Sequence, residues 1–290
     1  MSKLGLGTVQ FGLNYGIANQ FGMIKFSTAK QIIYLAREKK INLIDTAIDY
    51  GESEDVIGKI GISNFKVISK LPPPPKNCNN LKHWIEKEIR LCLERLKVKS
   101  LYGLLVHKTE SLIGEKGNII IDTLNNLKSR NLVKKLGVSI YDVNELEEVI
   151  KKMKIDIVQA PLNIVDRRLE TSGWLSELHR NNIEIHSRST FLQGLLLMPR
   201  AKIPAKFNKW SKIWDRWEYE LANNNLDAKT VCLSYPLSLK EVDKIIIGVD
   251  NIEQLNEIVL ASKKKIKNVN WSFMTSNDQM LLNPSNWINL

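Results

Sequence analysis

Short apolar runs alternate with amphipathic stretches along the whole chain. The apolar runs are nearly continuous in Val, Ile and Leu, which is typical of parallel strands buried on both faces. Eight such runs predict strands at Leu4–Gln10, Asn42–Ala47, Phe65–Leu71, Leu101–His107, Lys135–Ile140, Asp156–Leu162, Glu184–Thr190 and Lys244–Val249.

The stretches between these runs carry apolar residues at helical spacing. The clearest stripe is Ala29, Ile32, Ile33 and Ala36, and others lie within residues 85–96, 143–153 and 252–259. Ser27 stands where the first of these helices should begin and is expected to cap it. Eight strands, each followed by a helix, predict a single (β/α)₈ TIM barrel over residues 1–290.

A doubly wound sheet would show the same alternation, but the sequence lacks its phosphate-binding fingerprint. Gly5 and Gly7 continue into a strand instead of opening a helix. The barrel is therefore the preferred fold, and its active site is expected at the C-terminal rim of the strands.

Composition limits the class of protein. Of 290 residues, 43% are hydrophobic, and three cysteines without a CxxC pair predict neither a disulfide framework nor a zinc site. The first residues lack the apolar core of a signal peptide, and no apolar run approaches the ~20 residues that cross a membrane. We expect a soluble, cytoplasmic protein with no metal site and no membrane partner.

The chain has an excess of positive charge. Lys and Arg number 42 against 31 Asp and Glu, a formal net charge of +11. Such a balance favours anionic partners, although lysines spread over a solvated surface are the simpler explanation. No RNA-binding motif is present, so no nucleic-acid partner is expected.

Four polar residues stand where predicted strands end or have just ended. Asp45 ends the second strand, Tyr50 follows it, Lys70 ends the third and His107 ends the fourth. Each alone has a structural explanation, such as a helix cap, loop packing, a surface lysine or a hydrogen-bonded strand end. Together at one rim, they would surround one pocket.

This set of residues suits proton donation to a carbonyl oxygen. A phenol with a pKa near 10 donates poorly at neutral pH, and a nearby ammonium favours the phenolate and lowers that pKa. A carboxylate keeps the ammonium charged, and an imidazole holds the carbonyl oxygen. None of these groups supplies a hydride, so a reduced nicotinamide is required.

The motifs around these residues resemble the aldo-keto reductases over almost the whole chain. The most specific match runs from Leu43 to Gly51 and continues through Ser53, Glu54 and Gly58; Leu6–Gly12, Ile68–Lys70 and Leu104–His107 match the other motifs. The resemblance implies a (β/α)₈ barrel, an NAD(P)H-dependent oxidoreductase and a catalytic tetrad of Asp45, Tyr50, Lys70 and His107, with Tyr50 as general acid.

The resemblance also implies a cofactor site. The family's cofactor contacts fall on Thr8, Asp45, Ser139, Gln159, Arg188, Ser189, Gln193, Gly194, Gly248, Asp250 and Gln254. Arg188 stands where many relatives stack a tyrosine on the nicotinamide. Asp250 replaces a basic contact to the 2′-phosphate, so NAD(H) is possible beside the family's usual NADP(H), unless Asp250 only caps the last helix.

Two further motifs narrow the resemblance. The segments Gln10–Asn19 and Arg188–Leu197 are similar to a bacterial subgroup associated with surface and spore-coat polysaccharide synthesis. This implies a small carbonyl substrate, such as a sugar or nucleotide sugar. We expect the protein to be a monomer or homodimer.

Two alternatives stay open at this point. The first is a redox-sensing or scaffold protein that binds cofactor with little turnover. The second is an aldolase-type barrel that uses Lys70 as a Schiff-base amine.

Overall fold

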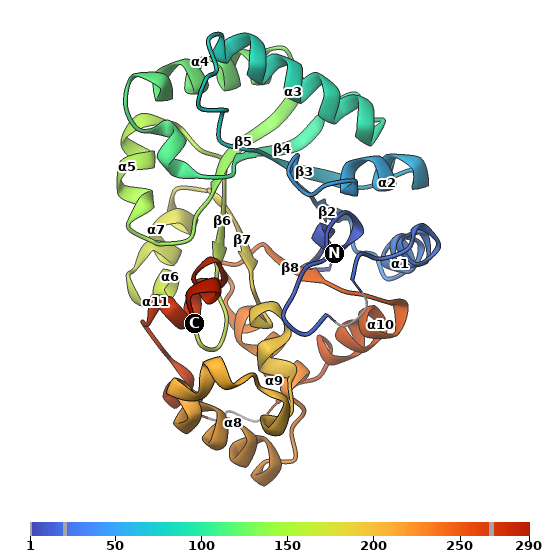
Figure 1. Cartoon of the computed structure of the whole chain (residues 1–290), viewed down its shortest axis with the longest axis vertical. Coiled ribbons are helices and arrows are strands. Elements are labelled where there is room, and N and C mark those ends of the chain that lie inside the picture. The colour runs from blue at the N-terminus through green and yellow to red at the C-terminus, as the bar shows by residue number, and fades with distance from the viewer. Residues whose placement is uncertain (1, 20–21, 267–269) are drawn as a thin grey trace.

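The computed structural model describes residues 2–19, 22–266 and 270–290. Eight parallel strands close into a barrel in sequence order, with β8 paired back to β1 (Figure 1). The predicted (β/α)₈ TIM barrel is confirmed. The strands are β1 Leu4–Gly7, β2 Leu43–Asp45, β3 Lys66–Leu71, β4 Leu101–Val106, β5 Val133–Ser139, β6 Ile157–Pro161, β7 Glu184–Arg188 and β8 Lys244–Gly248.

Helices surround the barrel (Figure 1). They are α1 Phe26–Glu38, α2 Ser53–Ile60, α3 Leu81–Leu96, α4 Glu115–Ser129, α5 Glu145–Lys152, α6 Arg168–Thr171, α7 Trp174–Arg180, α8 Ser211–Asn223, α9 Ala228–Ser238, α10 Ile252–Ala261 and α11 Gln279–Leu282. No helix in the described part of the chain has the length and apolar character needed to cross a membrane.

Two local predictions were wrong. The first strand ends at Gly7 and not at Gln10, because Val9–Phe11 turns into a 3₁₀-helix whose last amide bonds to the Thr8 carbonyl. Ser27 does not cap α1. That helix already begins at Phe26, and the N-cap position belongs to Lys25, whose side chain makes no capping bond.

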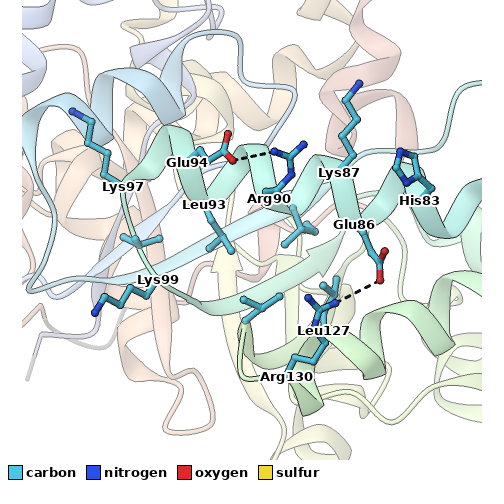
Figure 2. A pocket seen from close by; sticks show the side chains of 13 residues that line it. His83, Glu86, Lys87, Arg90, Leu93, Glu94, Lys97, Lys99, Leu127 and Arg130 are labelled. Atoms are coloured by element: carbon cyan, nitrogen blue, oxygen red, sulfur yellow. Dashed lines mark hydrogen bonds and ion pairs between the residues drawn. The ribbon is translucent and has the colours of Figure 1, made fainter.

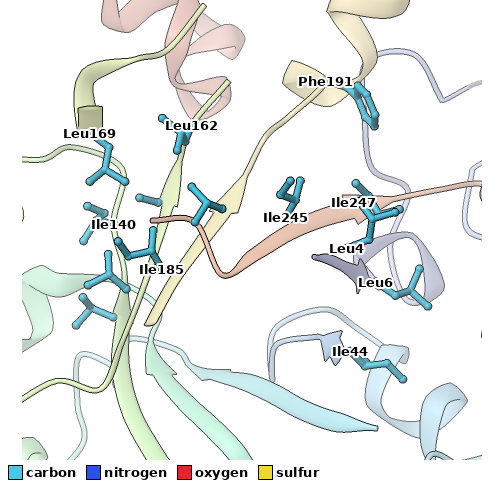
Figure 3. Close-up of a cluster of buried hydrophobic side chains, with 14 of the residues drawn as sticks. Leu4, Leu6, Ile44, Ile140, Leu162, Leu169, Ile185, Phe191, Ile245 and Ile247 are labelled. Carbon is cyan, nitrogen blue, oxygen red and sulfur yellow. The ribbon is translucent and has the colours of Figure 1, made fainter. Parts of the chain in front are cut away.

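The strands bury both faces, as their continuous apolar runs predict. One face packs beneath the helices, and Figure 3 shows Leu4, Leu6, Ile44, Ile185, Ile245 and Ile247 in this layer. The opposite face fills the barrel interior with a separate cluster of Leu43, Ile68, Leu105, Ile157 and Ile246.

Polar residues lie directly above this interior cluster. Side chains two positions apart on a strand share a face, so Asp45, Lys70 and Gln159 follow Leu43, Ile68 and Ile157 on the interior side. The C-terminal rim of the barrel is therefore a polar layer resting on an apolar plug.

A buried carboxylate fastens the first helices to this rim. Glu54, on α2, accepts hydrogen bonds from Arg95 of α3 at 2.6 and 2.8 Å. Its other oxygen accepts from the Ser69 hydroxyl at 2.7 Å and the Cys92 thiol at 3.0 Å. Burial and the Glu54 carboxylate raise the pKa of Cys92 well above its usual range, so the thiol keeps the proton that it donates.

Arg95→Met should therefore destabilise the protein by about 2–3 kcal/mol, because Glu54 would stay buried without its cation. Arg90→Met is the matched control on the same helix, since Arg90 pairs with Glu94 at the surface. It should cost under about 1 kcal/mol. Urea unfolding of both variants measures the difference, and equal losses would contradict the role assigned to Glu54.

Candidate active site

A buried ion pair forms the floor of the rim site. Lys70 Nζ lies 2.6 Å from Asp45 Oδ2 and also donates to the Thr46 carbonyl at 2.9 Å. Burial lowers the pKa of Lys70, but the Asp45 carboxylate and the Tyr50 oxygen together outweigh that effect, and the net shift is upward. Lys70 therefore stays an ammonium ion although only 1% of it is exposed.

Tyr50 stands over this pair. Its hydroxyl oxygen accepts a hydrogen bond from Lys70 Nζ at 3.4 Å. Burial raises the pKa of Tyr50 above 10, and Lys70 only partly offsets that rise. The sequence-based expectation gave the direction of the lysine's effect correctly but missed the larger effect of burial. The phenol is thus held in its protonated form.

A close backbone contact positions the Tyr50 loop. A Cβ atom on Gly12 would lie 1.8 Å from the Tyr50 carbonyl oxygen, which no side chain could tolerate. The next residue, Gly51, adopts a φ of +54°, in the left-handed region that favours glycine. Both glycines belong to the motifs that carry the family resemblance.

His107 completes the group. Its ring meets the Tyr50 ring edge-on, with centroids 5.9 Å apart. Its Nδ1 lies 3.4 Å from Asp49 Oδ2. The structure thus brings Asp45, Tyr50, Lys70 and His107 together. The sequence analysis did not single out Asp49. An acidic residue in a loop gives no sign along the chain that its carboxylate will lie beside a histidine.

Three buried hydroxyl groups tie the loop to the barrel. The Ser53 hydroxyl donates to the Thr8 side chain and lies 3.0 Å from that of Thr46, while Thr8 donates to the Asp45 carbonyl at 3.0 Å. Thr8 is fully buried, so in this structure its hydroxyl braces the site. All three residues lie within the motifs that carry the family resemblance, but the sequence did not predict that their hydroxyl groups bond to one another.

Gln159 reaches the ion pair from β6. Its amide Nε2 donates to Asp45 Oδ1 at 2.7 Å, so both carboxylate oxygens of Asp45 are bonded. Ser139 is the neighbour of Gln159 on β5 and is also buried. Of these two predicted cofactor contacts, Gln159 thus touches the ion pair directly, and Ser139 lies beside Gln159 in the sheet.

The segment after β7 packs against the segment after β1. Ser189 and Gln193 adopt left-handed backbone conformations, with φ of +61° and +54°. The side-chain amide of Gln193 donates to the Tyr15 hydroxyl at 3.1 Å. The backbone carbonyl of Gln193 accepts from the backbone N–H of Ala18 at 3.4 Å. A Cβ on Gly194 would lie 2.5 Å from that of Ala18. These contacts join the two loops across the rim.

The structure at the end of β8 rules out the alternative that Asp250 only caps the following helix. Asn251 caps α10, its side chain accepting from the Gln254 amide, so Asp250 does not cap this helix. Instead, the backbone N–H of Asp250 donates to Gln254 Oε1 at 2.8 Å, and the side-chain Nε2 of Gln254 lies 3.5 Å from Asp250 Oδ2. Burial raises the pKa of Asp250, with Gln254 opposing the rise.

This side of the rim fits a nicotinamide dinucleotide. Within the described residues, Gln10 Oε1, Thr190 Oγ1 and Asp250 Oδ1 are buried without hydrogen-bond partners. Gly248 lies against the Gln10 amide, where a Cβ would approach to 2.5 Å. Buried polar atoms without partners, next to a glycine that has no side chain, suit a ligand rich in hydroxyl and amide groups.

Arg188 does not lie free above this surface. Its guanidinium stacks on the Tyr141 ring at 4.3 Å and donates to the Ile140 carbonyl at 2.9 Å. One face of the group is therefore already occupied by an aromatic ring. Tyr141 carried no sequence signal, since it follows a strand as an ordinary loop residue would.

A hollow of about 650 Å³ lies on the outer surface between α3 and α4 (Figure 2). Its two acids are already paired, Glu86 with Arg130 and Glu94 with Arg90. None of the four rim residues lines it, so it is not the active site. Nowhere in residues 2–19, 22–266 and 270–290 do three His, Cys, Asp or Glu side chains form a group that could hold a metal.

Known proteins share both the sequence pattern and the fold. The chain is 25% identical over 288 residues to YqkF, an uncharacterized oxidoreductase of Bacillus subtilis (strain 168), with 91% of this chain and 88% of that protein covered. It is 26% identical over 302 residues to the NADH-specific methylglyoxal reductase of Escherichia coli (strain K12), with 90% of each covered.

Solved structures agree in fold. The aldo-keto reductase AKR11C1 of Bacillus halodurans superposes with a TM-score of 0.73 at 18% identity, covering 92% of this chain and 88% of that one. The thermostable aldo-keto reductase Tm1743 gives a TM-score of 0.69 at 22% identity, covering 92% of each.

The sequence model described as "Aldo/keto reductase family" matches residues 3–277. Because this match spans nearly the whole chain and includes all four rim residues, the chain belongs to the aldo/keto reductase family of NAD(P)H-dependent oxidoreductases.

Proposed function

We propose that this protein reduces an aldehyde or ketone to an alcohol at the rim site, with Tyr50 as general acid. The observation that carries the proposal is a protonated phenol held over a buried ammonium–carboxylate pair, with an imidazole beside it. The bound nicotinamide cofactor supplies the hydride.

Each side chain then has one task. Lys70 donates to the phenol oxygen, which leaves the phenol's own hydrogen free to reach a carbonyl oxygen. His107 holds that oxygen in place. As the carbonyl oxygen gains negative charge, the proton moves to it from Tyr50, and the Lys70 ammonium stabilises the phenolate that remains. Asp45 keeps Lys70 charged and aimed.

The proposed cofactor site follows the rim from β5 to β1. Ser139 and Gln159 would bind the carboxamide; Ser189, Gln193 and Gly194 would lie over the pyrophosphate; Gly248, Asp250 and Gln254 would hold the adenosine end; Thr8 would brace the floor from behind. Asp45 belongs to the tetrad and also bonds to Gln159, so it would join the cofactor site to the other three residues of the tetrad.

We further propose that NADH is used. Asp250 has no cationic partner in the described part of the chain, and its carboxylate would repel a 2′-phosphate. The Escherichia coli relative, at 26% identity, is named as NADH-specific.

The substrate is proposed to be a small carbonyl compound. The loops Gln10–Asn19 and Arg188–Leu197 support a sugar or nucleotide-sugar carbonyl and a place in polysaccharide synthesis. The Escherichia coli relative is named for methylglyoxal, a smaller carbonyl compound. Assays across neutral aldehydes and sugar carbonyls separate these classes.

The aldolase alternative is disfavoured by the state of Lys70. Schiff-base formation needs a neutral amine, whereas Lys70 is bonded to Asp45, Thr46 and Tyr50 and has a raised pKa. The scaffold alternative predicts cofactor binding without turnover, which the first variant below distinguishes from catalysis.

Tyr50→Phe should lower carbonyl reduction by roughly 10²–10⁴-fold, because phenylalanine keeps the ring but has no proton to donate. Cofactor affinity, measured by quenching of tryptophan fluorescence, should stay close to wild type. Tyr219→Phe removes an exposed hydroxyl and serves as the control. Half of wild-type turnover in Tyr50→Phe would eliminate Tyr50 as the acid.

Lys70→Met should also slow reduction, and the pH dependence of its rate should differ from that of the wild type. Lys70 lowers the pKa of Tyr50 against the effect of burial, so its loss should move the alkaline limb assigned to Tyr50 to higher pH. The losses from Tyr50→Phe and Lys70→Met should not add in the double variant, since both remove one proton-donating unit. Additive losses would show that the two residues act separately.

Asp250→Asn should improve NADPH binding relative to NADH and also stabilise the free protein at neutral pH. Burial raises the folded-state pKa of Asp250, so the ionised carboxylate destabilises the fold above its ordinary pKa of 3.8. The gain should vanish below that pH, where the acid is protonated in both states. Cofactor titrations and thermal unfolding between pH 3.5 and 7.5 test this; an unchanged NADPH-to-NADH ratio would remove Asp250 from cofactor selection.

A further inference from the structure

Arg188 lies on the interior side of the barrel mouth. It is the last residue of β7 and pairs in register with Pro161, two positions after the pair of His186 and Gln159. Gln159 points into the interior, where it bonds to Asp45. Since side chains two positions apart share a face, Arg188 lies on the same side, one step nearer the solvent.

The charge of Arg188 is not compensated. Its two bonds go to neutral acceptors, the Ile140 carbonyl at 2.9 Å and the Ser189 hydroxyl at 3.3 Å. No described carboxylate forms an ion pair with it. The nearby acids Asp142 and Asp166 are each bonded to Arg168 at 2.7 Å. A half-buried guanidinium without an anion is uncommon, because buried cations are normally paired.

Two tyrosines lie on the Arg188 side of the rim. Tyr141 stacks on its face at 4.3 Å. Tyr15 comes from the loop after β1, and its oxygen accepts from Gln193, which leaves its own hydrogen available as a donor. Burial raises the pKa of Tyr15, and the positive charge of Arg188 opposes that rise, so the two groups lie within electrostatic reach of each other.

We propose that Arg188 binds a phosphate or carboxylate group carried by the carbonyl substrate, and that the enzyme therefore prefers anionic carbonyl compounds such as sugar phosphates. The guanidinium has five N–H donors, two of which are used by the protein, and its fork matches two oxyanion oxygens. This inference rests on the proposed reduction at Tyr50. It gives Arg188 a substrate role in place of the nicotinamide stacking that its position predicted.

The test compares glyceraldehyde with glyceraldehyde 3-phosphate, which differ only in the anion. The wild type should favour the phosphate at least about tenfold in kcat/KM. Arg188→Gln should lower kcat/KM for the phosphate by roughly 10- to 100-fold, mainly through KM, and change the neutral aldehyde by less than threefold. Arg188→Lys should restore part of the loss. Arg180→Gln removes an exposed arginine and should change neither substrate.

The pyrophosphate of the dinucleotide is a second anion that Arg188 could bind. A cofactor titration distinguishes it from the anion of the substrate. NADH affinity, measured by tryptophan quenching, should stay within twofold of wild type in Arg188→Gln. A tenfold loss of NADH affinity with unchanged substrate KM would overturn the proposal, as would a wild type with no preference between the two aldehydes.

A binding measurement keeps the inference independent of turnover. Glycerol 3-phosphate should bind the NADH-saturated wild type, whereas glycerol should not, and Arg188→Gln should abolish that binding. If neither aldehyde is reduced but glycerol 3-phosphate binds through Arg188, the subsite stands and the proposed reduction fails. Absence of this binding overturns the subsite.

Discussion

The ion pair between Lys70 and Asp45 is the interaction on which the rim depends. Removing two charges from water is costly, and this cost is offset only when both groups are fully bonded. Here the ammonium also donates to the Thr46 carbonyl and to Tyr50, and the second carboxylate oxygen accepts from Gln159. The pair thus joins β2, β3 and β6 and fixes one charge beneath the phenol.

The barrel makes that arrangement possible by separating its apolar and polar layers. Interior leucines and isoleucines fill the lower barrel, and the next interior positions carry the polar groups. Parallel strands bring these positions to one end, whatever their distance in sequence. Helix α2 then holds the Tyr50 loop through two networks, the hydroxyl cluster at Ser53 and the carboxylate of Glu54.

The sequence predicted the features that follow from the regular order of strands and helices along the chain. Runs of Val, Ile and Leu located all eight strands, and the order and strand position of Asp45, Tyr50, Lys70 and His107 placed them at one rim. Contacts that depend on three-dimensional packing were missed, such as Asp49 with His107 and Tyr141 beneath Arg188. The net pKa shift of Tyr50 was missed for the same reason, since burial of a loop tyrosine leaves no pattern along the chain.

The central claim is that Tyr50 is a buried, protonated phenol whose ionisation is opposed by burial and assisted by Lys70. Ultraviolet difference titration of tyrosinate, wild type minus Tyr50→Phe, measures this ionisation directly in the protein without substrate. The account predicts that the Tyr50 signal appears above pH 10, and at still higher pH in a Lys70→Met background. A Tyr50 signal that titrates below pH 9, or at the same pH with and without Lys70, would contradict it.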